Sequence, residues 1–80
     1  MDVSEIRKIA RDVVIDVLEI DHNGLADDAS FYELGADSVQ RLEVVALLRV
    51  RLGIRYELAE ESRMNSIDDV ISITQARLHR

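Results

Sequence analysis

Apolar residues recur at helical spacing in three separate stretches of this chain, and that periodicity constrains the fold more than any other feature. The stripes are Ile6, Ile9, Val13, Val17 and Ile20; then Val44, Val45, Leu48 and Leu52; then Ile67, Val70, Ile71, Thr74 and Leu78. The sequence contains no proline and only three glycines, so few residues would interrupt a helix. The pattern therefore predicts an all-α protein built from amphipathic helices.

Capping and turn signals set the expected bounds of these helices. Capping boxes that begin at Asp2 and Ser66 predict the starts of the first and last helices. The Asp-His-Asn-Gly turn at 21–24 is expected to stop the first helix after about five turns. Residues 54–56 are expected to form an extended link, followed by a short third helix over 58–64.

Together these elements predict a small four-helix bundle with three long helices and one short helix. Eighty residues leave room for only one core, so residues 1–80 are expected to form a single domain. Residues 21–37 form a long loop between the first and second helices, in which Leu25, Phe31 and Leu34 are the expected apolar anchors.

The polar residues of this loop do not indicate a catalytic or metal site. His22 has no ligand-type residue at suitable spacing, so a solvated loop histidine is expected. Asp27 and Asp28 lack the regular oxygen spacing of a calcium loop and are expected to be solvated carboxylates. Ser30 with Glu33 predicts a small capping box around one helical turn at 30–34.

The start of the second helix, expected over 38–52, has a specific local chemistry. Gly35 can adopt a positive φ and so suits a tight entry turn. Asp37 is a good N-cap, and Gln40 stands where a capping box places its second member. Ser38 is then the first helical residue, at the positive end of the helix dipole, where an esterified phosphate would be well placed. A serine at such a position is more often a simple cap.

The run Leu-Gly-Ala-Asp-Ser-Val at 34–39, followed by a helix rich in Leu and Val, resembles the phosphopantetheine attachment motif of acyl carrier proteins. The resemblance extends to the turn at 53–54 and the final helix, and so covers nearly the whole chain. It implies a covalent 4′-phosphopantetheine arm on Ser38, with Asp37 and Gly35 completing the attachment site. The arm would tether acyl or aminoacyl intermediates as thioesters.

The implied function is delivery of intermediates rather than catalysis. One serine without a neighbouring base cannot run acyl transfer alone, so the chain is not expected to be an enzyme. The implied partners are a phosphopantetheinyl transferase, an acyl- or aminoacyl-loading enzyme, a ketosynthase, and condensation or other tailoring enzymes. A free-standing, monomeric carrier of polyketide or nonribosomal peptide assembly is expected. A carrier of fatty-acid synthesis and an unmodified helical interaction module are the alternatives.

The second helix departs from the acidic helix that is typical of fatty-acid synthesis carriers. Glu43 is its only acid, whereas Arg41 and two later arginines share the helix. Val39 and Leu42 form an apolar strip beside the serine that is expected to stay exposed for a partner. We therefore expect Val39, Leu42, Glu43 and Arg41 to take part in partner recognition.

Composition excludes several other function classes. The formal net charge of −6 opposes nucleic-acid binding, and the single Phe, two Tyr and absent Trp cannot build a platform for stacked bases. The chain has no cysteine, so it can form neither a disulfide nor a thiolate metal site. The absence of a long apolar run and of a signal peptide predicts a cytoplasmic protein without membrane contact.

Overall fold

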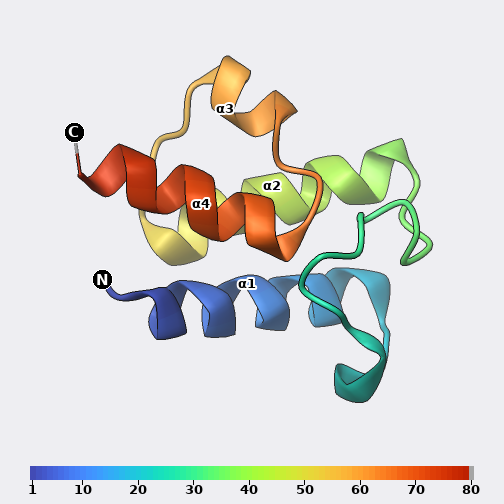
Figure 1. Ribbon diagram of the computed structural model, residues 1–80. Coiled ribbons are helices and arrows are strands. Elements are labelled where there is room, and N and C mark those ends of the chain that lie inside the picture. Colours follow the sequence, from blue (N-terminus) through green and yellow to red (C-terminus); the bar gives the residue numbers. More distant parts are fainter. Residues whose placement is uncertain (80) are drawn as a thin grey trace.

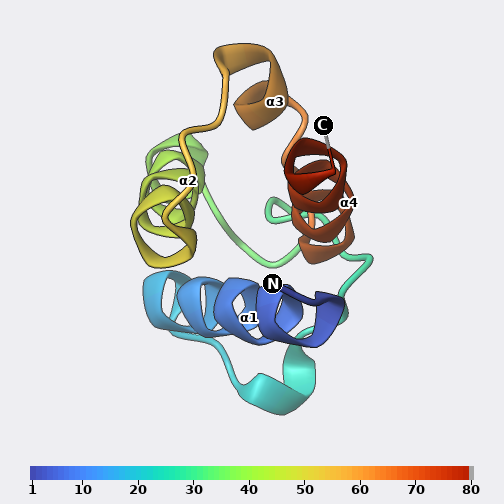
Figure 2. The ribbon, with the colours of Figure 1, turned by 90° about the vertical axis from the view of Figure 1, so that its left-hand side faces the viewer.

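The structure is a computed structural model that describes residues 1–79. Its elements are α1 (Val3–Leu18), the 3₁₀ turn η1 (His22–Gly24), α2 (Ser38–Leu52), α3 (Leu58–Ser62) and α4 (Ile67–Leu78). In Figure 1 and Figure 2, α2 and α4 lie side by side on α1, and α3 bridges them on the opposite side. The described part of the chain contains no strand, so the predicted all-α bundle of three long helices and one short helix is confirmed.

The core is formed where α1, α2 and α4 face one another. Its fully or almost fully buried helix residues are Ile6, Ala10, Val13, Val14, Val44, Val45, Leu48, Leu52, Ile67, Val70, Ile71, Ile73 and Thr74. The inward stripe predicted for α2 is therefore confirmed. From the loop, Leu25 and Phe31 are buried and Leu34 is half-buried, so all three expected anchors contact the core.

The end predicted for the first helix was wrong. α1 ends at Leu18, and Glu19 takes a left-handed conformation with φ of 54°, its N–H donating to the Ile15 carbonyl. The turn signal at 21–24 forms the separate turn η1, and Ile20 lies outside any helix. Left-handed caps favour glycine or asparagine, so a glutamate in that position gives little signal in the sequence.

The third and fourth helices also differ in detail from the prediction. α3 ends at Ser62, and Met64 lies beyond it as a fully buried residue of the linker. Ser66 caps α4 by accepting from the N–H of Asp69 at 3.1 Å. The Asp69 carboxylate, however, accepts from the N–H of Asn65 at 3.0 Å, so the second half of the expected capping box is displaced by one residue.

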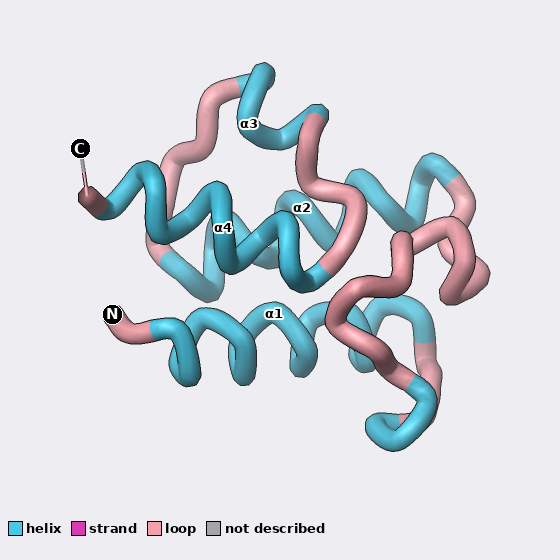
Figure 3. The backbone as a smooth tube through the Cα atoms, in the orientation of Figure 1, coloured by secondary structure: helices cyan, strands magenta, loops and turns pink. Residues whose placement is uncertain are grey.

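An ionic cluster fixes the long loop, which Figure 3 shows at the end of the bundle away from the N-terminus. The Asp27 carboxylate accepts from Arg7 Nε at 3.0 Å and from Arg11 Nη1 at 2.6 Å. The Asp27 carbonyl also accepts from the N–H of Asp68 at the start of α4, at 2.9 Å. The prediction of a solvated carboxylate was therefore wrong for Asp27, whereas Asp28 is exposed. The loop is tied to both α1 and α4.

Candidate functional site

The turn that leads into α2 is closed by a reciprocal pair of hydrogen bonds. The N–H of Glu33 donates to Ser30 Oγ at 3.0 Å, and the N–H of Ser30 donates to Glu33 Oε1 at 3.0 Å. The bond from the Ser30 backbone, followed by the one involving its side chain, lowers the pKa of Glu33. The N–H of Leu34 donates to the Ser30 carbonyl at 3.1 Å, so the predicted helical turn at 30–34 is confirmed.

The next residues set the direction in which the chain enters α2. Gly35 has a φ of 101°, in the left-handed region where a side chain would be strained. Ala36 is buried, and its N–H donates to the Phe31 carbonyl at 2.9 Å. The N–H of Phe31 donates in turn to the Asn65 carbonyl at 2.8 Å. Since Phe31 and Ala36 are fixed in the core, the residues that follow emerge at a defined point of the surface.

At that point α2 begins with a complete capping box. Asp37 Oδ1 accepts from the N–H of Gln40 at 2.8 Å, and Gln40 Oε1 accepts from the N–H of Asp37 at 3.1 Å. Ser38 is the first residue of the helix and is exposed. Its hydroxyl has no hydrogen-bond partner within residues 1–79. Asp37 therefore performs the capping, and the Ser38 hydroxyl is exposed to solvent at the positive end of α2.

The residues expected beside Ser38 are exposed as the sequence predicts. Val39 and Leu42 each keep 63 % of their surface in solvent. Glu43 is also exposed and makes no ion pair within the described chain. These three side chains are thus available to a partner that approaches the start of α2, and their role in recognition stays a prediction.

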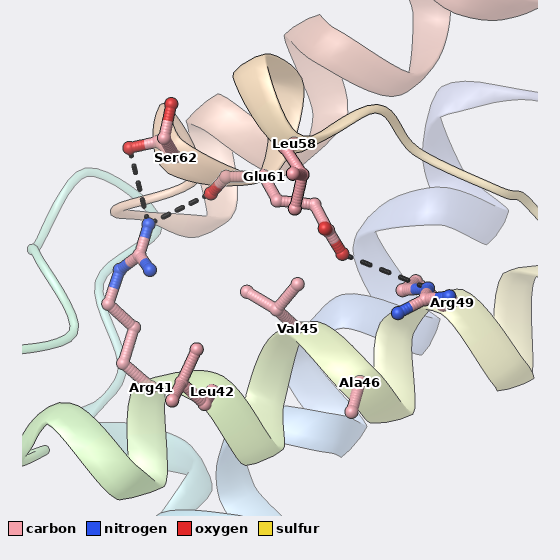
Figure 4. Close-up of a pocket in the computed structure, with 8 residues that line it drawn as sticks. All are labelled: Arg41, Leu42, Val45, Ala46, Arg49, Leu58, Glu61 and Ser62. Carbon is pink, nitrogen blue, oxygen red and sulfur yellow. Dashed lines mark hydrogen bonds and ion pairs between the residues drawn. The ribbon is translucent and has the colours of Figure 1, made fainter.

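Arg41 is not the free surface charge that the sequence suggests. Its Nη2 donates to the carbonyls of Glu61, Ser62 and Met64 at 2.9, 3.3 and 3.0 Å, and its Nε donates to Asn65 Oδ1 at 3.3 Å. Figure 4 shows the side chain reaching from α2 to the end of α3. Arg41 therefore joins α2 to the carbonyls at the end of α3 and in the linker that follows it. Its contribution to partner recognition stays a prediction.

A hollow of about 300 Å³ lies between α2 and α3. It is lined by Leu42, Val45 and Ala46 of α2 and by Leu58 of α3, and Figure 4 shows Val45 pointing toward Leu58. The lining is mainly apolar, so the hollow can accept a small apolar group. It was missed at the sequence level because it depends on where α3 packs, and no periodicity in five residues reveals that.

Other kinds of site find little support in residues 1–79. No group of three or more His, Cys, Asp or Glu side chains converges there in a way that could hold a metal ion. His22 is exposed, in agreement with a solvated loop histidine. None of the described helices combines the length and apolar character that a membrane crossing requires.

Comparisons with known proteins bear on the same region. The family described as "Phosphopantetheine attachment site" matches residues 8–71, which include all of α2. The chain is 33 % identical over 69 residues to polyketide-8 synthase acyl carrier protein 2 of Streptomyces avermitilis, covering 85 % of this chain and 79 % of that protein. It is 31 % identical over 72 residues to an acyl carrier protein of Thermosynechococcus vestitus, covering 89 % of each.

Proposed function

This chain belongs to the acyl carrier proteins, the family of the phosphopantetheine attachment site, and on that premise we propose that Ser38 is the residue that carries the arm. Proteins of this family are carriers, not catalysts, and hold 4′-phosphopantetheine covalently. The observation that carries the proposal is that Asp37, and not Ser38, caps the start of α2. Asp37 and Gln40 close the capping box, so the Ser38 hydroxyl is not needed for capping.

The surroundings of Ser38 fit a phosphodiester. The first N–H groups of α2 and its dipole favour negative charge at this end of the helix. Gly35 and Ala36 hold the entry turn, so the hydroxyl lies at a fixed point of the surface. We give Asp37 a second role, the presentation of its carboxylate to the phosphopantetheinyl transferase. When bound, the arm supplies the thiol that this cysteine-free chain lacks.

Partners that act on the arm must approach the start of α2. Glu43 lies five residues after Ser38, which corresponds to about 8 Å along the helix axis. Val39 and Leu42 lie between them and are exposed. We propose these three side chains as contacts for the transferase, for acyl- or aminoacyl-loading enzymes, and for a ketosynthase or other condensing and tailoring enzymes. We also propose that the chain is one carrier domain, because α1, α2 and α4 share a single core.

For the pathway, we propose polyketide assembly. One relative is named as a polyketide synthase carrier, but a second, named only as an acyl carrier protein, is nearly as similar. Sequence identity therefore does not distinguish between the possible pathways. The charge of α2 supports the proposal more strongly: Glu43 is its single acid, against Arg41, Arg49 and Arg51. A basic docking patch on a fatty-acid synthesis enzyme would find only Glu43 to pair with on α2 and would meet Arg49 unfavourably. Arg41, in contrast, is held by carbonyls at the end of α3, and Arg51 by Asp16 of α1.

The attachment proposal is tested by intact-mass measurement after incubation with coenzyme A and a broad-specificity phosphopantetheinyl transferase. Wild type should gain one phosphopantetheine group, and Ser38→Ala should gain none while keeping its helical circular dichroism. Ser4→Ala is the matched control, because Ser4 is also an exposed serine in the first turn of a helix but lacks the glycine lead-in. A wild type that stays unmodified while another carrier is loaded, or a Ser38→Ala variant that still gains the group, would overturn the proposal.

The pathway proposal is tested by acyl transfer from the modified protein to two ketosynthases, one from polyketide and one from fatty-acid synthesis. The polyketide enzyme should react faster, and the difference should shrink as salt rises because it arises from exposed charges. Equal rates at low salt, or a faster fatty-acid enzyme, would contradict it.

A further inference from the structure

The outer face of α2 carries an apolar stripe that runs well past Ser38. Its members are Val39, Leu42, Ala46 and Val50, which follow one another at helical spacing and are all exposed. Val50 keeps 76 % of its surface in solvent, more than either Val39 or Leu42. It lies twelve residues after Ser38, about 18 Å along the helix axis, and so belongs to a different part of the surface from the attachment site.

A second hollow, of about 380 Å³, lies at this far end of α2. It is lined by Ala46, Arg49, Val50, Gly53, Ile54 and Arg55. Gly53 ends the helix in a left-handed conformation, and the N–H of Ile54 donates back to the Arg49 carbonyl at 3.2 Å, which brings Ile54 beside the last turn. Ala46 and Arg49 also line the hollow between α2 and α3, so the two hollows adjoin.

The charge of this region is opposite to that of the chain. Residues 49–55 contain Arg49, Arg51 and Arg55 and no acid, in a protein of net charge −6. Arg55 is exposed and has no ion pair within the described residues. Arg49 has only the Glu61 carboxylate, at 3.8 Å, which is the longest ion pair of the described chain (Figure 4). Arg51 faces the other way and pairs with Asp16 of α1 at 3.0 Å.

We propose that this hollow is a second docking site, and that its occupant is a segment of a partner protein with an apolar side chain flanked by carboxylates. Ala46, Val50 and Ile54 provide an apolar surface for the side chain, while Arg49 and Arg55 lie where they can pair with the carboxylates. An occupant that uses the whole lining must combine an apolar side chain with carboxylates, which a small anion or a nucleic acid does not do. The site extends the proposed function, because a partner seated there can still reach the arm at Ser38.

The two halves of the site have different expected effects on binding. Arg49 and Arg55 are exposed charges, so they should chiefly raise the association rate, and their effect should fall with salt. Val50 and Ile54 offer apolar contact area, so their contribution should persist at high salt. The site also discriminates against basic partner surfaces, which agrees with the charge argument for the pathway.

The test is a titration of the unmodified, ¹⁵N-labelled protein with two synthetic amphipathic peptides that share their leucines and differ only in Glu against Lys. The Glu peptide should shift the amide signals of Ala46, Val50, Gly53, Ile54 and Arg55, and its affinity should fall as salt rises. The Lys peptide should bind more weakly by about tenfold or more at low salt. Sedimentation of the protein alone should show no self-association.

Three variants separate the contributions. Arg55→Glu should weaken binding of the Glu peptide by about tenfold at low salt and by less at high salt. Lys8→Glu makes the same change of charge on α1 and is the matched control, which should bind like wild type. Val50→Ser should weaken binding at every salt concentration, without unfolding, because Val50 is largely exposed.

Several results would overturn the docking site. They are equal binding of the two peptides, shifts confined to other surfaces, equal losses in Arg55→Glu and Lys8→Glu, or shifts that grow with protein concentration in the absence of peptide. The last would identify a second copy as the occupant, whose residues 1–40 carry a charge of −7. Loading of Ser38 is measured on the same samples. Normal loading without peptide binding overturns only the docking site, and peptide binding without loading overturns only the attachment proposal.

Discussion

Replacing Arg41 by methionine should loosen the attachment of α3 to the rest of the bundle. The only buried residue of α3 is Glu60, so this helix adds no apolar side chain to the core and depends on polar contacts. Methionine keeps the apolar stem of Arg41 and removes the guanidinium that donates to the linker after α3 and to its last carbonyls. Arg41→Met therefore tests those hydrogen bonds with little change in packing.

The magnitude follows from the geometry of the four bonds. Two are short, at 2.9 and 3.0 Å to the carbonyls of Glu61 and Met64, and two are long, at 3.3 Å. A hydrogen bond from a charged group contributes about 1.5–3 kcal/mol. Because the guanidinium is only partly buried, we take about 1 kcal/mol for each short bond and nothing for the long ones. The free energy of unfolding should fall by about 2 kcal/mol, which lowers Tm by roughly 10 °C in a domain of this size.

Urea unfolding followed by circular dichroism measures this change. Arg63→Met is the matched control: Arg63 is exposed and makes one long bond, at 3.3 Å, to the Ala59 carbonyl of the same turn. Its substitution should change the free energy of unfolding by less than about 0.5 kcal/mol. If Arg41→Met unfolds at the same urea concentration as Arg63→Met, the carbonyl contacts do not hold α3 and the reasoning is refuted.

Three further predictions follow from single contacts. Asp37→Ala should lower the free energy of unfolding in urea by about 1 kcal/mol, and Asp37→Asn should lower it less because asparagine also caps helices well. If the Asn variant is loaded with the arm as fast as wild type, the carboxylate charge has no role in transferase recognition. Because the pKa of Glu33 is lowered, its hydrogen bonds stabilise the fold above the ordinary pKa of this group and lose that effect as pH falls through the lowered pKa. The NMR titration midpoint of Glu33 in the wild type should lie below the ordinary value, and Ser30→Ala should raise it only in part because the backbone N–H of residue 30 remains; a wild-type midpoint at the ordinary value would contradict this. Burial raises the pKa of Tyr56, so its contribution to the free energy of unfolding is fully present below the ordinary tyrosine pKa and is lost as pH rises through the raised pKa. An ultraviolet titration should show one tyrosine that ionises above the ordinary pKa, and Tyr56→Phe should remove that step.

The features that the sequence predicted well are local ones. The capping box of Asp37 with Gln40 and the turn closed by Ser30 with Glu33 each join residues three apart, so their residue types alone identify them. The range 38–52 expected for the second helix is also correct, and Gly53 follows it in the left-handed conformation that glycine adopts at little cost. The geometry around Ser38 could therefore be predicted largely from the sequence.

The features that were missed join residues far apart in the chain. Asp27 pairs with Arg11, sixteen residues earlier, and Arg41 reaches carbonyls at least twenty residues later. Glu60 is buried against Arg77 of α4, with 2.7 Å between Oε1 and Nη1. An isolated charge in a sequence is most often solvated, and only the packing of helices shows which charges have partners. The roles of these residues therefore required the structure.

The claim that Ser38 carries the arm is tested most directly by locating the group in the modified protein. Trypsin should release a peptide over 12–41, bounded by Arg11 and Arg41, which contains two serines, Ser30 and Ser38. The Ser30 hydroxyl accepts a hydrogen bond from the N–H of Glu33 in the capping box, whereas the Ser38 hydroxyl has no partner in the described chain. Fragmentation of this peptide by tandem mass spectrometry should place one phosphopantetheine group on Ser38. A group on Ser30, or on a serine in any other peptide, would contradict the account.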